Sequence, residues 1–526
     1  MNNHAQSSAK ANAGSSATPG AVPRLPGESS GPEDRSVSLQ ESGAAGKGTA
    51  ISAHPLLFGC LVVLVGYRQL RPYFDLKEFL WNLLAVLACI TLVQLLFGVV
   101  ARKPYKSAIA ASLCVVSFCF FGDFKALCER WLLNTSWSAL ASARWVLPVT
   151  ALVFVLLFWT LVRCQRSLFT LHRYLNVLSG ALVLANAAEI AWSSPRIQTA
   201  GNPRAQSPLH LGANPPDIYY ILADGYTSPE SLMRFWRYDD SPLVNSLTQQ
   251  GFQVVTNAHG NSTFTPWCLS IYLNMDYPPT AVSSLPMPAQ TVYYGRIIED
   301  AEAPARLKAS GYEIANLSIF ATAGQPRYYF FPKISVSSLG GVLLNRTPIG
   351  YLLAYRTRAF LGDTNLDILS RLPAIAAQRS GRPKFVYAHL MMPHPPYLFD
   401  SEGHRIQRGM GMDDQYPDLY LGQLIYENKL LTNVIAGILK NSKTPPVIIL
   451  QGDHGFRSLP GEHQQEEATT ILNALYLPGS TAGWIYPGMT PVNTFRMIFN
   501  HYFGEHYDYL PDNVPKALSR FVKTSP

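Results

Sequence analysis

The chain has 526 residues, of which 48% are hydrophobic and only 14% are charged, and its formal net charge is +8. This length predicts two or three folded units rather than one. Soluble domains carry about a quarter of charged residues, so the shortage of charge predicts a membrane segment. The positive charge is modest and no nucleic-acid-binding motif accompanies it, which argues against a nucleic-acid partner.

The first 192 residues predict a tail followed by a membrane domain. Residues 1–50 are rich in Ala, Ser, Gly and Pro and have almost no large apolar residues, so they predict a disordered tail. Residues 51–192 contain several apolar stretches, and about 20 such residues are needed for a helix to cross a bilayer. We therefore predict a transmembrane domain of about five spans, at residues 55–73, 79–101, 106–122, 143–163 and 170–192.

Loop charges give the expected orientation of this domain. The breaks at 102–106 and 163–173 hold only basic charges, as cytoplasmic loops do, and the tail adds further basic residues. The N-terminus is then predicted inside, and five spans place the C-terminal domain outside the cytoplasm. Only Cys268 lies beyond residue 200, so that domain has no internal disulfide, which suits a bacterial inner or plasma membrane.

Residues 193–215 predict a linker, and residues 216–526 a second domain in which short apolar runs alternate with helical patterns. This alternation predicts an α/β sandwich around a largely parallel sheet. Three helices are predicted, at Glu230–Tyr238, Leu243–Gln250 (ended by Gly251) and Leu419–Asn441. The predicted strands are Asp217–Leu222, Phe252–Val255, Glu313–Leu317, Lys384–Leu390, Val447–Gln451 and Ile471–Leu477.

Residues of the metal-ligand type follow three of these strands. Asp224 follows the first strand, His389 and His394 lie at and after the fourth, and Asp453-His454 follows the fifth. In open α/β sheets, functional residues gather at the carboxyl ends of strands. Carboxylates and neutral imidazoles bind zinc, and carboxylates also suit manganese or magnesium. One such residue after a strand is explained equally well by a polar turn, but three in one domain predict a metal site.

This ordered set of strand-end motifs resembles the alkaline-phosphatase-like superfamily over about residues 216–480. The pattern is most similar to its membrane-anchored, sulfatase-like branch, which includes lipoteichoic-acid synthases and lipid A phosphoethanolamine transferases. The helical N-terminal region also matches that branch. The resemblance implies a multi-pass helical membrane domain followed by an α/β domain of the alkaline-phosphatase/sulfatase type.

The resemblance also implies roles for individual residues. Asp224 takes the place of the acidic metal ligand after the first strand, and Thr265, before Pro266, that of the nucleophile at a helix start. We expect Thr265 to be the N-cap and Pro266 the first helical residue. Ser262 and Thr263 compete with Thr265 as the nucleophile.

The implied cofactor is a divalent metal, zinc or manganese, with magnesium and calcium as alternatives. Its implied ligands are Asp224, Thr265, Asp453 and His454. His394 is expected to contact the substrate phosphate or a second metal, and His389 is either an active-site residue or a buried core histidine. His463 is a further candidate for a second metal. Metal coordination would activate the threonine hydroxyl, which is a poor nucleophile at neutral pH.

One motif of the true sulfatases is missing. They carry Cys or Ser in a C/S-x-P-x-R stretch that is oxidised to formylglycine, whereas Cys268-Leu-Ser-Ile-Tyr lacks both Pro and Arg. The sequence therefore favours a metal-dependent phosphotransferase or phosphodiesterase of the cell envelope. It would act through Thr265 on phosphoglycerol- or phosphoethanolamine-type donors, with a membrane lipid or envelope glycan as substrate.

Three alternatives stay open. The first is a sulfatase-like hydrolase of sulfate or phosphate esters, for which water alone is the acceptor. The second is a non-catalytic membrane scaffold with a retired sulfatase-like domain, although such a scaffold has no need of the set Asp224, Thr265, Asp453 and His454. The third is a transporter, which few intramembrane charges and a large outer domain make a poor fit.

Overall fold

The computed structural model describes part of the chain. The predicted tail, residues 1–50, lies outside that part, as do residues 193–206 of the predicted linker and His463. Side chains of some helical residues, such as 354–360, are also left out. The described residues are 52–70, 76–101, 103–132, 140, 143–192, 207–278, 287–328, 338–406, 416–458, 468–481 and 483–512.

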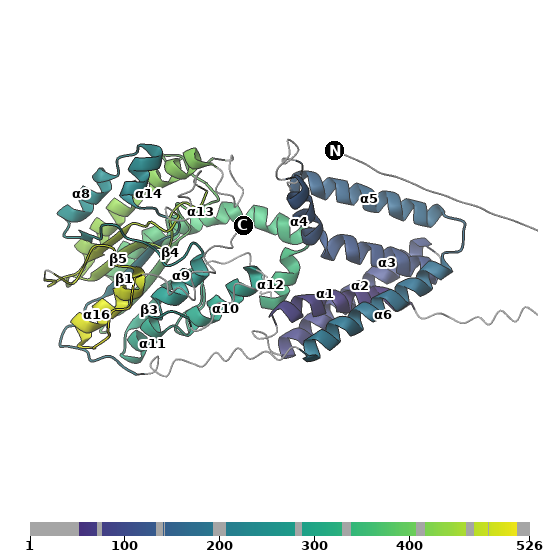
Figure 1. Cartoon of the computed structure of the whole chain (residues 1–526), viewed down its shortest axis with the longest axis horizontal. Helices are drawn as coiled ribbons and strands as arrows, with labels where there is room; N and C mark the ends of the chain where they lie inside the picture. The colour runs from purple at the N-terminus through teal and green to yellow at the C-terminus, as the bar shows by residue number, and fades with distance from the viewer. Residues whose placement is uncertain are drawn as a thin grey trace, which may run out of the picture. The chain divides into compact units, whose positions relative to one another are not determined.

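The described residues of all five predicted apolar stretches lie in helices, except for a turn at Phe120 (Figure 1). By length and composition, three of the described helices could each cross a membrane, namely Leu76–Ala101, Trp145–Arg163 and Phe169–Trp192. Two further helices, Pro104–Cys119 and Phe121–Cys128, are bent by 55° relative to each other and make a fourth span if they cross together. The first apolar helix is shorter, so the count of five spans stays a prediction. The helices are α1 (His54–Leu70), α2 (Leu76–Ala101), α3 (Pro104–Cys119), α4 (Phe121–Leu132), α5 (Ala143–Arg163) and α6 (Phe169–Trp192).

Large apolar side chains cover the outer surface of the long helices. On α2, Leu84, Leu95 and Val99 are 59%, 66% and 80% exposed. A helix satisfies its backbone hydrogen bonds internally, so such a surface is stable in lipid, whereas contiguous apolar surface of this extent is rare on soluble proteins. The chain is therefore an integral membrane protein.

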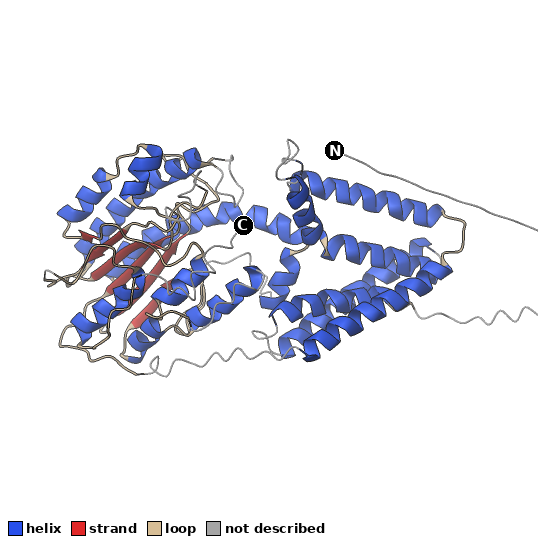
Figure 2. Cartoon of the chain, viewed as in Figure 1, coloured by secondary structure: helices blue, strands red, loops and turns tan. Residues whose placement is uncertain are grey.

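A six-stranded sheet forms the centre of the second region (Figure 2), in the order β2-β6-β5-β1-β4-β3. The pairs β1–β4, β1–β5 and β3–β4 are parallel, whereas β6 runs antiparallel to β5 and β2. The α/β fold that the sequence predicts, with a largely parallel sheet, is thus confirmed. The strands are β1 (Ile218–Ala223), β2 (Gln253–Val254), β3 (Glu313–Leu317), β4 (Lys384–Leu390), β5 (Val447–Gly452) and β6 (Asn473–Tyr476).

Helices cover both faces of the sheet because alternate residues of the buried strands point to opposite sides. Tyr220 and Leu222 of β1 pack in a core with α9 (Thr265–Tyr272), and Tyr219 and Ile221 pack in a second core on the other face. The first core also includes α10 (Met287–Glu299), α11 (Glu302–Ala309) and α16 (Thr494–Phe503), after the 3-10 turn η5 (Pro491–Asn493). The second includes α8 (Ser241–Gln249), α13 (Pro348–Ala377) and α14 (Pro417–Asn441), and α12 (Ser338–Asn345) precedes α13.

The helix predicted at Glu230–Tyr238 differs in the structure. It is a single turn, α7 (Pro229–Ser231), followed by a π-helical turn, η4 (Leu232–Trp236). The left-handed conformation of Arg237 (φ 53°) ends this turn, and the Trp236 ring then packs on Tyr420 and Phe456. Sequence periodicity does not distinguish a π turn from an α-helix over so few residues.

Candidate active site

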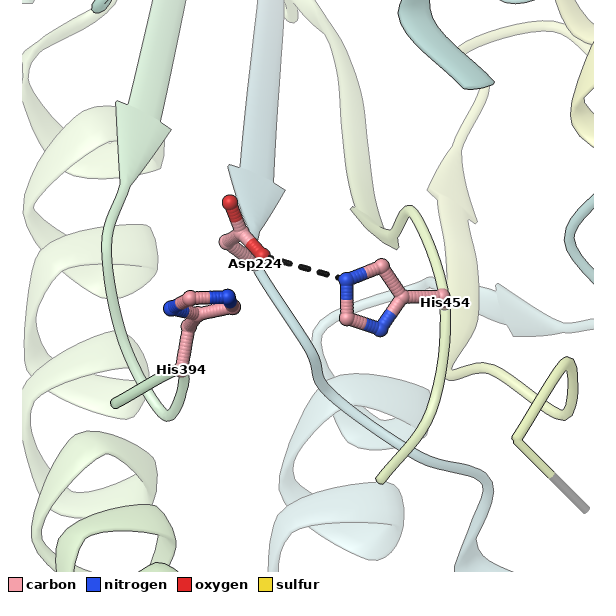
Figure 3. Close-up of side chains that lie close together, drawn as sticks. All are labelled: Asp224, His394 and His454. Atoms are coloured by element: carbon pink, nitrogen blue, oxygen red, sulfur yellow. Dashed lines mark ion pairs between the residues drawn. The ribbon is translucent and has the colours of Figure 1, made fainter. Parts of the chain in front are cut away.

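The register of the three central strands brings the predicted ligands to one edge of the sheet. Ala223, the last residue of β1, pairs with Leu390 of β4 and with Gly452 of β5. Asp224 and Asp453 follow directly on these adjacent strands, and both side chains are buried. Figure 3 shows that the rings of His394 and His454, from the segments after β4 and β5, flank the Asp224 carboxylate. The predicted convergence of these segments is present in the fold.

Side-chain atoms of Asp224, Thr265, Asp453 and His454 lie near one another at this edge. His454 Nε2 lies 3.5 Å from Asp224 Oδ1 and 3.6 Å from Asp453 Oδ2. Thr265 Oγ1 lies 3.5 Å from Asp224 Oδ1 and 3.4 Å from His454 Nε2. These contacts are long for hydrogen bonds, but tetrahedral ligands at about 2.1 Å from an ion are separated by about 3.4 Å. These four separations therefore fit those between ligands of a tetrahedral divalent-metal site.

An unsatisfied atom supports the same fit. Asp453 Oδ2 is buried and has no hydrogen-bond partner among the described residues. A buried carboxylate oxygen without a partner is costly, and a cation among the four atoms would remove that cost. The donor set of two carboxylates, one imidazole and one hydroxyl suits zinc or manganese.

Asp224, Asp453 and His454 each have a second polar atom, which contacts another group of the protein. The second oxygen of Asp224 lies 3.0 Å from His389 Nε2, and that of Asp453 accepts a hydrogen bond from the Gly225 amide at 3.0 Å. His454 Nδ1 lies 2.7 Å from the Gly455 carbonyl oxygen, so Nδ1 carries the proton and Nε2 keeps its lone pair. Such outer contacts orient metal ligands and fix their tautomer.

The charge of Asp224 follows from its neighbours. Burial alone would raise its pKa, but the imidazoles of His394, His389 and His454 outweigh burial and hold the pKa well below its ordinary value. Asp224 is therefore ionised, which is the form that binds a metal.

Thr265 begins the helix on which the nucleophile was predicted, with a shift of one residue. The N-cap is Phe264, whose carbonyl accepts from Trp267 and Cys268, and Thr265 is the first residue of α9. The prediction that Thr265 caps the helix is therefore wrong. Instead its hydroxyl faces Asp224 and His454, whereas the hydroxyl of Ser262 accepts from the Phe264 amide.

His394 lies beside the same centre, and Asp224, His394 and His454 each offer one ligand atom within 4.8 Å of the others. Its Nδ1 is 2.6 Å from the Pro395 carbonyl oxygen, and its Nε2 is 2.6 Å from Nη2 of Arg457. Arg457 is not among the residues that the sequence predicts for the site. The only available signal was its place three residues after His454, on the loop that carries two predicted ligands.

The structure brings together six of the seven predicted site residues. His389 is fully buried, and its Nε2 lies 3.0 Å from Asp224 Oδ2. Cys268 is buried, its Sγ donates to the Ser262 carbonyl, and burial raises the pKa of its thiol well above the ordinary value. It is a packed side chain. The predicted role of His463 stays untested, because that residue is outside the described part.

Comparison with known proteins gives a family match to one part of the chain. Residues 349–482 match the model of the Sulfatase family, and this segment contains His389, His394, Asp453 and His454. By sequence, no curated protein matches the chain.

Two solved structures illustrate the structural similarity. The C-terminal periplasmic domain of EptC from Escherichia coli, in complex with Zn, is 12% identical, with a TM-score of 0.37 over 57% of this chain and 87% of that one. The integral membrane lipooligosaccharide phosphoethanolamine transferase A (EptA) from Neisseria meningitidis is also 12% identical, with a TM-score of 0.34 over 81% and 87%. These values are low, and the site described above stands on its own contacts. Together with the family match, the observed architecture confirms the predicted combination of apolar N-terminal helices and a sulfatase-like α/β domain.

Proposed function

We propose that the protein is a metal-dependent phosphotransferase or phosphodiesterase that forms a covalent intermediate on Thr265. The observation that carries the proposal is the position of Thr265 Oγ1, within 3.5 Å of Asp224 and His454 and on a helix start that points into the site. A divalent metal held by Asp224, Thr265, Asp453 and His454 would lower the pKa of the hydroxyl and offset charge on the phosphoryl oxygens.

The reaction needs only a donor and an acceptor hydroxyl, and its atoms balance over two steps. In the first step Thr265 Oγ1 loses its proton and forms a bond to phosphorus, while the bond from phosphorus to the donor alcohol breaks and that alcohol takes up a proton. In the second step the hydroxyl of an acceptor, a glycan, lipid or water, loses its proton and forms a bond to phosphorus, while the bond from phosphorus to Thr265 Oγ1 breaks and Thr265 regains a proton. His389 holds Asp224, and the Gly225 amide holds Asp453, so that both carboxylates keep their orientation during both steps.

The membrane helices suggest the substrate class. A catalytic domain attached to a membrane works near lipid headgroups, so we propose phosphoethanolamine or phosphoglycerol lipids as donors and a lipid or envelope glycan as acceptor. The loop charges favour an extracytoplasmic domain on a bacterial inner or plasma membrane.

A hydrolase of sulfate or phosphate esters is the second candidate, because the family match is to sulfatases. Phosphoryl transfer is favoured over sulfate hydrolysis by the surroundings of Cys268. This thiol is fully buried and lies in a stretch without the Pro and Arg that formylglycine formation requires by resemblance.

The test is intact-mass measurement of the detergent-purified full-length protein, loaded with zinc or manganese and mixed with phosphatidylethanolamine or phosphatidylglycerol. We expect a phosphoryl-containing adduct on Thr265 in the wild type. We expect no adduct in T265A, with turnover reduced by at least about three orders of magnitude.

S262A is the matched control, because Ser262 competes with Thr265 as nucleophile, and it should keep the adduct. An adduct that persists in T265A, or metal-loaded protein that turns over donor with no adduct at any time, contradicts the proposal. Release of the donor headgroup to water, with every offered acceptor unmodified, would favour the hydrolase.

A further inference from the structure

We propose that Arg457, and not a second metal ion, is the cation that faces the transferred group, so that the centre binds one divalent metal per chain. This inference deepens the proposed function and rests on it for the identity of the anion. Of the two expectations for His394, contact with the substrate or with a second metal, the proposal favours the substrate. It also predicts that His463 is not a ligand of a second metal.

The first argument is the environment of His394. Its Nδ1 lies 2.6 Å from the Pro395 carbonyl oxygen, which requires a proton on Nδ1. Its Nε2 then accepts a hydrogen bond from Nη2 of Arg457 at 2.6 Å. The single lone pair with which His394 could bind a metal is therefore used by a guanidinium, which is permanently charged.

The second argument is that the carboxylate oxygens needed to bridge two metals are used by the scaffold. Oδ2 of Asp224 contacts His389 Nε2, and Oδ1 of Asp453 accepts from the Gly225 amide. One oxygen of each carboxylate remains for the tetrahedral set with His454 and Thr265. Among the described residues, a second metal beside His394 would have to displace these contacts and lie next to the Arg457 charge.

The third argument is that Arg457 is held in place. It follows Phe456, whose buried ring packs against Trp236 at 5.3 Å and Tyr420 at 4.7 Å between ring centroids. The Gly455 amide also donates to the Ala468 carbonyl at 2.8 Å. Arg457 therefore projects from an anchored loop, and its cost of immobilisation on binding an anion is small.

The position of the guanidinium matches the expected path of the substrate. Nη1 of Arg457 lies 3.4 Å from the carbonyl oxygen of Thr263, two residues before Thr265. The group thus lies between His394 and the segment that carries the nucleophile. A planar guanidinium matches two oxygens of a phosphate, and here it would bind the oxygens of the group that Thr265 accepts.

Metal content gives the first test, and it does not depend on activity. The detergent-purified full-length protein is saturated with zinc, separated from free ion and measured by mass spectrometry of the elements against protein concentration. We expect one zinc per chain in the wild type, in R457Q and in H463A, and a loss of zinc in D453N. Two zinc ions per wild-type chain would overturn the proposal.

Anion binding gives the second test, with inorganic phosphate as the probe in calorimetric titration of the one-metal protein. We expect R457Q to weaken phosphate binding by at least about tenfold, because a charge-assisted hydrogen-bond pair is lost. R457K keeps the charge but loses the planar fork, and should weaken binding by several-fold.

R382Q is the matched control. It removes the same charge from an arginine that pairs with Glu313 at the amino-terminal end of β3, at the opposite edge of the sheet. R382Q should bind phosphate as the wild type does. Phosphate binding by R457Q and R457K equal to that of the wild type would overturn the proposal.

The two proposals fail in different ways. If phosphate binding depends on Arg457 but no adduct forms on Thr265, the covalent transferase is wrong and the anion site stands. If the adduct forms while R457Q binds phosphate normally, the covalent mechanism stands and the role of Arg457 is wrong.

Discussion

At the scale of single residues, the site is built from side chains with one atom toward the centre and another fixed by the scaffold. The carboxylates of Asp224 and Asp453 have this arrangement, and so do the imidazoles of His454 and His394. Each ring is held as the tautomer that leaves Nε2 unprotonated. The orientation of these groups is thus set by backbone groups, namely the Gly225 amide and the carbonyls of Pro395 and Gly455, and by the side chain of His389.

A buried acid at some distance in sequence from these ligands gives a prediction on pH. Burial raises the pKa of Asp240 to about 7, although hydrogen bonds from Tyr226 and Asn428 oppose the rise. The geometry agrees, because Tyr226 Oη lies 3.1 Å from Asp240 Oδ2 and 2.6 Å from Asn428 Oδ1 and has one proton for two acceptors. A proton on Asp240 supplies the missing donor.

Proton linkage gives the direction in which the free energy of unfolding changes with pH. The folded state holds this proton up to about pH 7, whereas the unfolded chain releases it near pH 4, so Asp240 lowers the free energy of unfolding as pH rises between these values. The loss is at most about 4 kcal/mol. In D240N, whose amide donates to Tyr226 at every pH, this part of the pH dependence should vanish.

Thermal unfolding of both proteins between pH 5 and pH 8 measures the effect. The free energy of unfolding of the wild type, minus that of D240N, should decrease as the pH rises over this interval. A difference that is constant with pH would show that Asp240 is ionised in the folded protein.

At the scale of elements, the end of β5 leaves no room for a side chain. A Cβ atom at Gly452 would lie 2.4 Å from the Tyr226 carbonyl oxygen, which belongs to the turn after β1. Because backbone is in the way, G452A must separate the ends of β1 and β5, at a cost of about 1–3 kcal/mol. We expect a lower unfolding temperature and weaker metal binding.

Gly381 provides the matched control, since a Cβ there meets no atom within 4 Å and its φ is not in the left-handed region. G381A should unfold and bind zinc like the wild type. Equal behaviour of G452A and G381A would mean that the turn after β1 moves without cost.

Some strands and helix ends are predicted well from the sequence, and others are not. The bounds of β3 and β4 agree with the prediction, and Gly251 has the positive φ expected after a helix end. These elements have local signals, an apolar run or a glycine. The antiparallel direction of β6 depends on where the chain returns to the sheet, and no local pattern carries that information. Likewise α13 and α14 pack together in one core, but only α14 has the apolar periodicity that predicts a helix.

The sequence predicts the site residues that directly follow strands. It does not predict Arg457, whose place at the site depends on the fold. Asp224, Asp453 and His454 come directly after apolar runs, so the sheet rule places them. Arg457 acts across the site, on a histidine 63 positions earlier, and such contacts between distant segments are not visible in one sequence. The tautomers of His394 and His454 likewise required coordinates.

At the scale of the whole molecule, the metal would join segments that are far apart in the chain. Asp224, Thr265 and Asp453 come from three segments of the sheet region, which are close together only after folding. A ligand that binds only the folded state raises the free energy of unfolding, by about 4 kcal/mol at 1,000 times its Kd. Removal of the metal should therefore destabilise the whole domain.

Thermal unfolding of the purified protein with and without a strong chelator checks this prediction. The wild type should lose stability when the chelator is added and regain it with zinc. D453N, which lacks a ligand, should respond to neither. A wild-type unfolding temperature that is the same with and without chelator would contradict a metal in this site.

The central place of β1 has a consequence for the order of events during synthesis. β1 is the first strand to leave the ribosome, but both of its sheet neighbours, β4 and β5, end at Leu390 and Gly452. The nascent chain must therefore keep a buried, apolar strand without its partners while more than half of the domain is translated. Asp224, at the end of that strand, meets Asp453 only in the last stage, so an incomplete chain cannot be active.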